Sequence, residues 1–180
     1  MKPLYYILLL FCIPSLGQTV TDTSAAEESI KLRHIEGIRG FDLSYGLNPY
    51  GNQFGFGYAQ YESDNFIGRI VLNYESGKIN LTTYSTQYLF IEFNSTVCRL
   101  KKRFFLNLAY GALAGQENSG NEVLNTKANT FEYGLLLGVN AEIYILNRFS
   151  VLIEFKQIWD NGSGFGSFRY YSNTGLRFNL

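Results

Sequence analysis

Apolar and polar side chains alternate with period two over most of the chain, and the pattern is clearest between residues 131 and 143. One parity there is apolar and consists of Phe131, Tyr133, Leu135, Leu137, Val139, Ala141 and Ile143. The other parity carries Glu132, Gly134, Gly138, Asn140 and Glu142, with Leu136 as its exception. Successive side chains of a β-strand point to opposite faces, so this segment predicts a long strand with one apolar face.

The same alternation predicts eight strands along the chain. They lie at about residues 36–47, 53–61, 66–75, 79–93, 104–115, 131–143, 149–156 and 168–180. Turns are expected at 48–52, 76–78 and 147–148, and loops at 116–129 and 161–166, where the sequence is polar or rich in glycine. Within 79–93 both parities carry apolar residues, so the pattern does not decide which face is apolar.

An even number of strands of about ten residues suits a transmembrane barrel, whose strands cross the bilayer tilted by about 45°. The segment 53–61 also puts large residues on one face and very small ones on the other, as a narrow barrel requires. A secreted β-sandwich would alternate too, but it does not predict apolar stripes as long as 131–143. The sequence therefore predicts an all-β fold, an eight-stranded antiparallel transmembrane β-barrel spanning residues 36–180.

The final predicted strand favours the same fold. Its polar-x-Gly-x-x-apolar-x-apolar pattern, formed by Asn173, Gly175, Phe178 and Leu180, resembles the C-terminal signal that the bacterial barrel-assembly machinery reads. A last strand that pairs with the first closes the wall and removes the exposed edge. We therefore expect the barrel-assembly machinery and outer-membrane lipid as partners.

The N-terminus predicts export. Met1-Lys2 is followed by an apolar stretch from Leu4 to Leu16, and Ser15-Leu16-Gly17 offers small residues for a signal peptidase. About thirteen apolar residues are too few to span a bilayer. We predict a signal peptide at 1–17, cleaved before Gln18, and a periplasmic lead-in at 18–35. The location is then the bacterial outer membrane, with the 116–129 and 161–166 loops outside the cell.

Composition agrees with this placement. Aromatic residues make up 17% of the chain, and the mean hydropathy of −0.06 is too low for a helical membrane protein. The 15 basic and 15 acidic residues balance, which argues against a nucleic-acid-binding surface spread over the domain. Cys12 lies in the predicted signal peptide, which leaves Cys98 as a lone thiol.

Charged residues on the predicted inward faces are candidates for a lumen ion-pair network, and they are Glu132, Glu142, Glu154, Lys156 and Arg177. An eight-stranded barrel is only wide enough for side chains, and buried charges must be paired. Paired carboxylates can also serve acid–base catalysis, but that needs a cleft and a substrate, which nothing in the sequence indicates. His34 lies alone in the lead-in, and no residues have metal-ligand spacing. We predict no enzyme activity, no cofactor and no metal.

The concentrated basic run consists of Arg99, Lys101, Lys102 and Arg103. The strand count puts it in a periplasmic turn. It is either a solvated turn whose side chains reach the inner headgroups or a docking patch for an acidic periplasmic partner. Four cations are too few to indicate direct DNA binding.

Several segments resemble a known family. They are Gly37-Ile38, the stretch Tyr110 to Glu117, Tyr133 to Glu142, Arg148 to Leu152, and Trp159 to Gly162. Through them the chain resembles TraO, the conjugal-transfer protein of Bacteroidetes conjugative transposons. The resemblance implies a structural outer-membrane component of a type IV secretion-like apparatus, with other transfer proteins as partners and no catalytic residues.

Two other classes of function stay open. One is a generic small barrel that acts as an adhesin or stabilises the envelope through its outer loops. The other is a small-solute channel or a lipid-modifying enzyme, which would need an open lumen or an apolar pocket. A lumen filled by side chains could not itself pass DNA.

Overall fold

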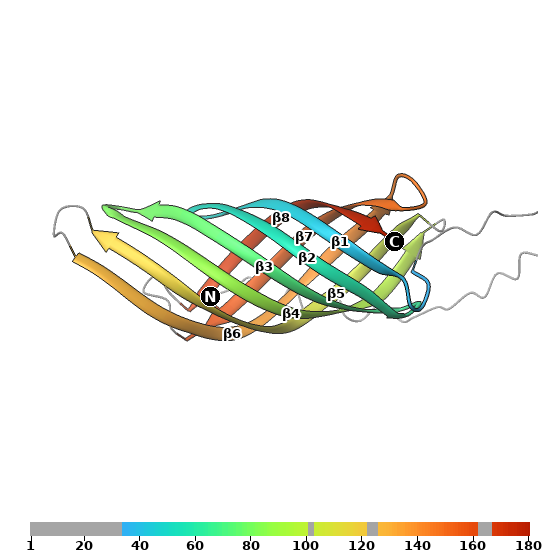
Figure 1. Cartoon of the computed structure of the whole chain (residues 1–180), viewed down its shortest axis with the longest axis horizontal. Helices are drawn as coiled ribbons and strands as arrows, with labels where there is room; N and C mark the ends of the chain where they lie inside the picture. Colours follow the sequence, from blue (N-terminus) through green and yellow to red (C-terminus); the bar gives the residue numbers. More distant parts are fainter. Residues whose placement is uncertain (1–33, 101–102, 122–125, 162–166) are drawn as a thin grey trace, which may run out of the picture. The chain divides into compact units, whose positions relative to one another are not determined.

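The computed structural model describes residues 34–100, 103–121, 126–161 and 167–180, which form eight β-strands (Figure 1). The strands are β1 (Arg39–Asn48), β2 (Gly51–Ser63), β3 (Phe66–Ile79), β4 (Thr82–Leu100), β5 (Phe104–Asn121), β6 (Thr126–Tyr144), β7 (Phe149–Asp160) and β8 (Phe168–Asn179). The predicted signal peptide and nearly all of the predicted lead-in lie outside the described residues. Within those residues, no helix is long and apolar enough to cross a membrane.

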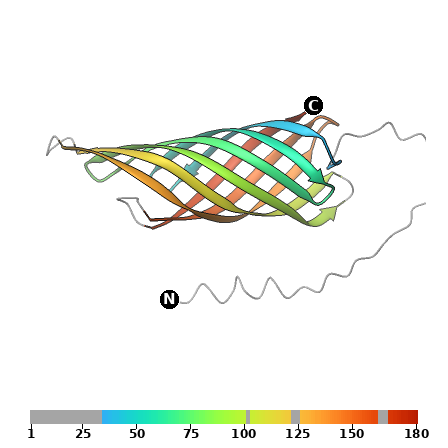
Figure 2. The same ribbon diagram turned by 60° about the horizontal axis from the view of Figure 1, so that its bottom comes forward.

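The sheet closes on itself. Each strand pairs antiparallel with the next, and β8 returns to pair with β1 from Gly40↔Asn179 to Leu47↔Ser172. Figures 1 and 2 show the resulting barrel and the tilt of its strands from two directions. The predicted eight-stranded antiparallel barrel is confirmed, and the sandwich alternative is excluded.

The inward and outward faces of the strands follow the alternation of polar and apolar residues in the sequence. In β6, Glu132 and Glu142 are buried while Phe131 and Leu137 are exposed, as predicted. In β4, where the pattern was undecided, Phe90 points into the lumen and its neighbours Leu89 and Ile91 point outward. The small inward residues make room for the charged ones. A Cβ added at Gly57, for example, would lie 3.3 Å from the Cβ of Asp42.

A cluster of apolar side chains fills part of the lumen, and it consists of Val71, Tyr88, Phe90, Leu113, Leu136, Ile158 and Tyr171. Leu136 is the residue that interrupts the polar parity of β6. Its inward position shows that the interruption belongs to lumen packing and does not mark a change of face.

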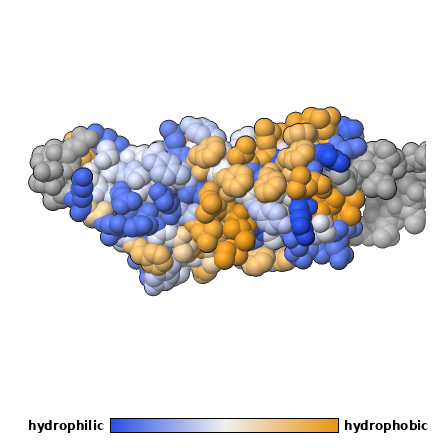
Figure 3. Space-filling model, in the orientation of Figure 1, coloured by the Kyte–Doolittle hydropathy of each residue, from blue (hydrophilic) through white to orange (hydrophobic). Residues whose placement is uncertain are grey.

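The outside of the barrel carries a wide apolar belt. Exposed members come from all eight strands and include Leu43, Phe56, Leu72, Ile91, Tyr110, Leu135, Phe155 and Leu176. Figure 3 shows this apolar surface over one part of the barrel and a hydrophilic surface toward the end where the β5–β6 hairpin projects. Soluble proteins rarely expose a continuous apolar patch of this kind, whereas a wall in contact with lipid requires one. The barrel therefore spans a membrane.

The predicted extents of one loop and one turn were wrong. β5 runs to Asn121 and β6 begins at Thr126, so most of the predicted 116–129 loop is paired strand. β3 runs through the predicted 76–78 turn, and the chain reverses at Asn80, whose φ of 54° is a left-handed conformation that asparagine tolerates. These strand ends are largely polar on both faces, with Ile79, Tyr84 and Ala128 as the exceptions. The alternation signal disappears there, although the ladder of backbone hydrogen bonds continues.

Candidate functional site

The terminal end of the barrel carries His34, Leu180 and the turn between β6 and β7 at 145–148. The extension is the part of four strands beyond the apolar belt at the opposite end, residues 75–79, 82–86, 117–121 and 126–130. The lumen lies between them.

Arg69 occupies the middle of the lumen and ties β3 to three other strands. Its Nε donates to Asp42 Oδ2 at 2.9 Å, and its Nη1 lies 2.9 Å from Glu92 Oε2 and 2.6 Å from Glu154 Oε1. Lys156 Nζ donates to Glu92 Oε1 at 2.6 Å and pairs with Glu154 Oε2 at 3.2 Å. All five side chains are buried, and each carboxylate here has a cationic partner. Charges in such a site hold opposite walls together.

Arg177 of β8 continues the network toward the terminal end. Its Nε and Nη2 donate to the two carboxylate oxygens of Asp42 at 2.5 and 2.8 Å, and its Nη1 donates to Glu142 Oε2 at 3.1 Å and to the Tyr61 hydroxyl at 3.0 Å. A bidentate arginine–carboxylate pair fixes geometry as well as charge. Here it joins the first strand to the last.

His34 closes the network at the terminal end. Its Nε2 lies 3.0 Å from Glu142 Oε2, and its ring stacks on Phe105 with 3.7 Å between the ring centroids. The Tyr61 hydroxyl donates to Glu142 Oε1 at 2.9 Å, and the Ser150 hydroxyl donates to the same oxygen at 2.7 Å. The expectation that His34 stands alone was wrong, because the residue lies inside the barrel mouth and is buried.

Arg169 organises the part of the lumen nearest the extension. Its Nη2 donates to Glu132 Oε2 at 2.8 Å and to Asp160 Oδ2 at 2.9 Å, and its Nη1 lies 3.7 Å from Glu75 Oε1. The Tyr84 hydroxyl donates to Glu75 at 2.7 Å. Charged and aromatic side chains thus fill this level together. Among the described residues, no group of three or more potential ligands is placed to hold a metal ion.

The structure brings together some of the five predicted network residues. Glu142 pairs with Arg177, and Glu154 pairs with Lys156. Glu132 does not meet the other four but pairs with Arg169. The network roles of Asp42, Glu92, Arg169 and Asp160 were not predicted, although each lies at an inward position of its strand. Counting the charged residues at the inward-facing positions of every strand could have found them.

The lumen leaves little free space between these levels. A cavity lined by Ser44, Gln53, Phe90, Lys156 and Tyr171, among others, has a volume of about 10 Å³. That is room for one water molecule at most. The lumen thus holds packed side chains where a channel would need continuous water.

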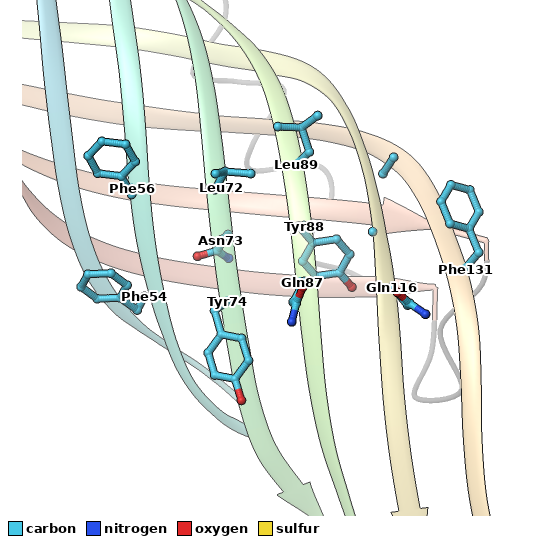
Figure 4. A pocket seen from close by; sticks show the side chains of 12 residues that line it. Phe54, Phe56, Leu72, Asn73, Tyr74, Gln87, Tyr88, Leu89, Gln116 and Phe131 are labelled. Atoms are coloured by element: carbon cyan, nitrogen blue, oxygen red, sulfur yellow. The ribbon is translucent and has the colours of Figure 1, made fainter.

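A shallow groove of about 660 Å³ lies on the outer wall, where the belt meets the extension (Figure 4). It crosses β2 to β6, and its lining includes Phe54, Leu72, Tyr74, Gln87, Leu89, Ala114, Gln116 and Phe131. Gln116 Nε2 donates to Asn129 Oδ1 at 2.8 Å at its polar rim. The groove is apolar toward the membrane and polar toward the extension.

The basic run is only partly described. Arg99 lies in β4 and not in a turn, because β4 continues to Leu100. Its guanidinium donates to the Asp64 carbonyl and the Asn65 side chain and lies 5.6 Å from the centroid of the Phe105 ring. Arg103 is exposed, and Lys101 and Lys102 lie outside the described residues. A docking role for this run stays a prediction.

The residues of the predicted assembly signal lie on β8 and at its end. Asn173 is buried and accepts a hydrogen bond from Gln53, and Gly175 pairs with Ser44 across the seam. The Phe178 ring lies 4.9 Å from that of Phe149, and Leu180 is exposed. These positions fit a closing strand. Recognition by the assembly machinery stays a prediction.

Comparison with solved structures gives the same fold. The N-terminal barrel domain of OprF from Pseudomonas aeruginosa aligns with a TM-score of 0.61 at 9% identity, covering 81% of this chain and 98% of that chain. Neisserial surface protein A aligns with a TM-score of 0.59 at 8% identity, covering 79% and 96%. Ail, the attachment invasion locus protein of Yersinia pestis, aligns with a TM-score of 0.53 at 11% identity, covering 81% and 100%.

No protein-family model matches the sequence, and no curated protein matches it. The likeness to TraO therefore rests on the residues quoted for it alone. The solved structures are too distant in sequence to show more than the fold. With the apolar belt and the charged lumen, that fold makes this protein a small eight-stranded barrel of the bacterial outer membrane.

Proposed function

We propose that this barrel is a non-conducting surface-recognition protein, an adhesin in the broad sense, that works through its extension outside the cell. The observation that carries the proposal is an open strand edge on β6. β6 pairs with β5 along its whole length, but its pairing with β7 begins only at Gly134↔Asp160. Among the described residues, no strand pairs with 126–133 on the β7 side.

The direction of the backbone groups on this edge follows from one hydrogen bond. Asn161 N donates to the Tyr133 carbonyl at 3.2 Å, so the carbonyl of Tyr133 points toward the β7 side. Backbone groups of alternate residues in a strand point the same way. Those of Lys127, Asn129 and Phe131 therefore point to the open edge too.

An open edge can accept an extended segment of another protein as an additional strand. Exposed polar side chains such as Asn118 and Asn129 line the outward face of the extension, as expected for an edge that lies in water. Lys127 on the edge discourages indiscriminate pairing, since a partner strand must accommodate its charge. The fold shared with Ail, an attachment protein by its description, supports the class of function. The filled lumen supports a role without transport.

The test uses one position and two substitutions. Asn129→Pro removes the N–H that points to the open edge but none of the backbone hydrogen bonds to β5, whereas Asn129→Ala keeps that N–H. Both variants lose the side-chain hydrogen bond from Gln116, so they differ at the open edge. Cells that lack the gene should attach several-fold less to target cells or matrix proteins. Asn129→Pro should restore little attachment, and Asn129→Ala should restore it in full. Unchanged attachment of the deletion strain, or equal rescue by both variants, would overturn the proposal.

A second candidate is a structural role in conjugative transfer, and the resemblance to TraO favours it. The segment Tyr110 to Glu117, which carries part of that resemblance, contributes Ala114, Gly115 and Gln116 to the outer groove. In this role the barrel would anchor other transfer proteins in the outer membrane. Mating frequency from a donor that lacks the gene tests it. A drop of several orders of magnitude that the intact gene restores would support it, and unchanged transfer would reject it.

A further inference from the structure

The β5–β6 hairpin projects from one end of the barrel (Figure 1), and two carboxyl groups meet at its base. Glu117 of β5 and Glu132 of β6 are diagonal neighbours, because the register partner of Glu117 is Thr130, two residues before Glu132. Both side chains face the lumen, where Glu132 is fully buried and Glu117 is 2% exposed. They are hydrogen-bonded to each other. The pair lies just before Gly134, at which the pairing of β6 with β7 begins.

A hydrogen bond between two carboxyl groups needs a proton on one of them, since two carboxylates offer acceptors only. The contacts of Glu132 agree with this requirement. Its Oε2 accepts from Arg169 Nη2 at 2.8 Å and from the Tyr88 hydroxyl. Its Oε1 is buried and, with the carboxyl group ionised, has no donor among the described residues. A proton between Glu132 and Glu117 would supply the donor that this site lacks.

The surroundings of the pair favour keeping a proton. The titratable and charged groups that face the pair or its immediate neighbours are Glu75, Tyr84, Tyr88, Asp160, Arg169 and Tyr171. Arg169 pairs with the carboxyl groups of Glu75, Glu132 and Asp160. Lys78 and Lys127 stand at exposed positions of their strands. Carboxylates that crowd a buried site repel one another, so a proton on one of them is favoured.

We propose that Glu117 and Glu132 hold one proton between them at neutral pH, and that its release in alkaline solution loosens the base of the hairpin. The proton passes to hydroxide and leaves two carboxylates in contact, so a hydrogen bond becomes a repulsion inside the lumen. Among the described residues, no strand pairs with β6 on the β7 side between this point and the tip. The hairpin is therefore held at its base mainly by β4 and β5, and the loss of this contact acts on its weakest edge.

The sign of the pH dependence follows from counting protons. The closed hairpin binds one proton that the opened hairpin has lost, because solvated carboxyl groups ionise near pH 4.3. The stabilisation is thus complete in acid and is lost as the pH rises. While the closed form keeps its proton, the equilibrium constant for opening should rise about tenfold per pH unit. Weaker attachment in alkaline solution would follow as well, but that consequence rests on the function proposed for the edge of β6.

Infrared spectroscopy of the refolded mature barrel, in a detergent without carbonyl groups, tests the proton directly. At neutral pH the natural protein should show the carbonyl band of a protonated carboxyl group, although exposed carboxyl groups are ionised there. Glu117→Gln and Glu132→Gln should each remove the band, since the new amide donates to the carboxylate that remains. Glu62→Gln, at an exposed acid of β2, is the matched control and should leave it unchanged. Absence of the band from the natural protein, or equal bands in the two variants at the pair, would overturn the proposal.

Hydrogen exchange measures the loosening. Protection of the amides of residues 126–133, corrected for the intrinsic exchange rate at each pH, should fall about tenfold per pH unit between pH 6 and 8. Protection of the β7–β8 ladder should not change, and neither should that of the hairpin in Glu132→Gln, whose amide has no proton to release in this range. Heat-modifiable migration in gels checks that the variants fold. Constant protection in the natural barrel, or an equal fall in Glu132→Gln, would overturn the loosening. Attachment that ignores pH while both measurements succeed would count against the function proposed for the edge and not against the shared proton.

Discussion

Arg177 and Asp42 face each other across the seam at which the last strand closes the barrel. They are register partners in the β8–β1 ladder, and two parallel hydrogen bonds of 2.5 and 2.8 Å join the guanidinium to the carboxylate. Both residues also form ion pairs with other strands: Asp42 pairs with Arg69, and Arg177 pairs with Glu142. Closure of the wall and filling of the lumen therefore depend on one connected set of charges.

Loss of one member of the seam pair should destabilise the barrel strongly. Arg177→Met leaves Asp42 and Glu142 with fewer cationic partners in the buried lumen. We expect a loss of about 3–5 kcal/mol in the free energy of unfolding, the usual cost of breaking a buried pair. Guanidinium unfolding in lipid vesicles, followed by the fluorescence of Trp159, measures it. Arg39→Gln, an exposed arginine of β1, should change stability by less than about 0.5 kcal/mol. Equal effects of the two variants would contradict a structural role for the seam pair.

His34 should control access to the lumen from the terminal end. Ser150 is fully buried, and its hydroxyl donates to the same Glu142 carboxylate that His34 contacts. In a Cys98→Ser background, a thiol placed by Ser150→Cys should react slowly with a polar maleimide. It should react at least tenfold faster when His34→Ala is added. His34→Phe keeps a ring on Phe105 and should stay slow. A rate that does not depend on residue 34 would show that another group closes this end.

The filled lumen predicts electrical silence. In planar bilayers the natural barrel should give no single-channel steps. Arg69→Ala removes a side chain that contacts Asp42, Glu92 and Glu154, which leaves three carboxylates at one level of the lumen. Water and cations should enter there, so this variant should show small cation-selective steps. Single-channel current steps from the natural barrel at neutral pH would contradict the prediction that it does not conduct. Silence of Arg69→Ala would show that the apolar cluster alone blocks the lumen.

The sequence predicted the strands of the belt well because one face of each meets lipid. In β6 the alternation from Phe131 to Ile143 gave the correct face for every residue, and the exception at Leu136 had its cause in lumen packing. In the extension, 82–86 fell within the predicted strand 79–93, but 116–129 was predicted as a loop and 76–78 as a turn. Those residues meet water outside and mostly polar groups inside, so they show no alternation. The partners of the lumen charges could not be predicted, since the contact of Glu132 with Arg169 depends on the register and stagger of the closed sheet.

The position of His34 in the lumen could not be predicted from the sequence either. Its contact with Glu142 joins residues 108 positions apart, and nothing in the local sequence around His34 distinguishes it from a polar linker. Its φ of 22° and the φ of 84° at Gly37 turn the chain into the barrel mouth just before β1 begins. Such a contact exists only once the wall is closed.

Leu136 and Leu137 allow a direct test of which face of β6 points into the lumen, because the two leucines are neighbours on this strand. Leu136 is 4% exposed and belongs to the lumen cluster, whereas Leu137 is 56% exposed and belongs to the belt. Leu136→Ala should cost about 2–5 kcal/mol, since it leaves a cavity among packed side chains. Leu137→Ala should cost less than half of that, because lipid chains fill the space that the lost methyl groups leave. The same unfolding measurement with Trp159 compares them directly. Equal costs, or a larger cost at Leu137, would mean that the faces of β6 are reversed and that the charges assigned to the lumen face the membrane.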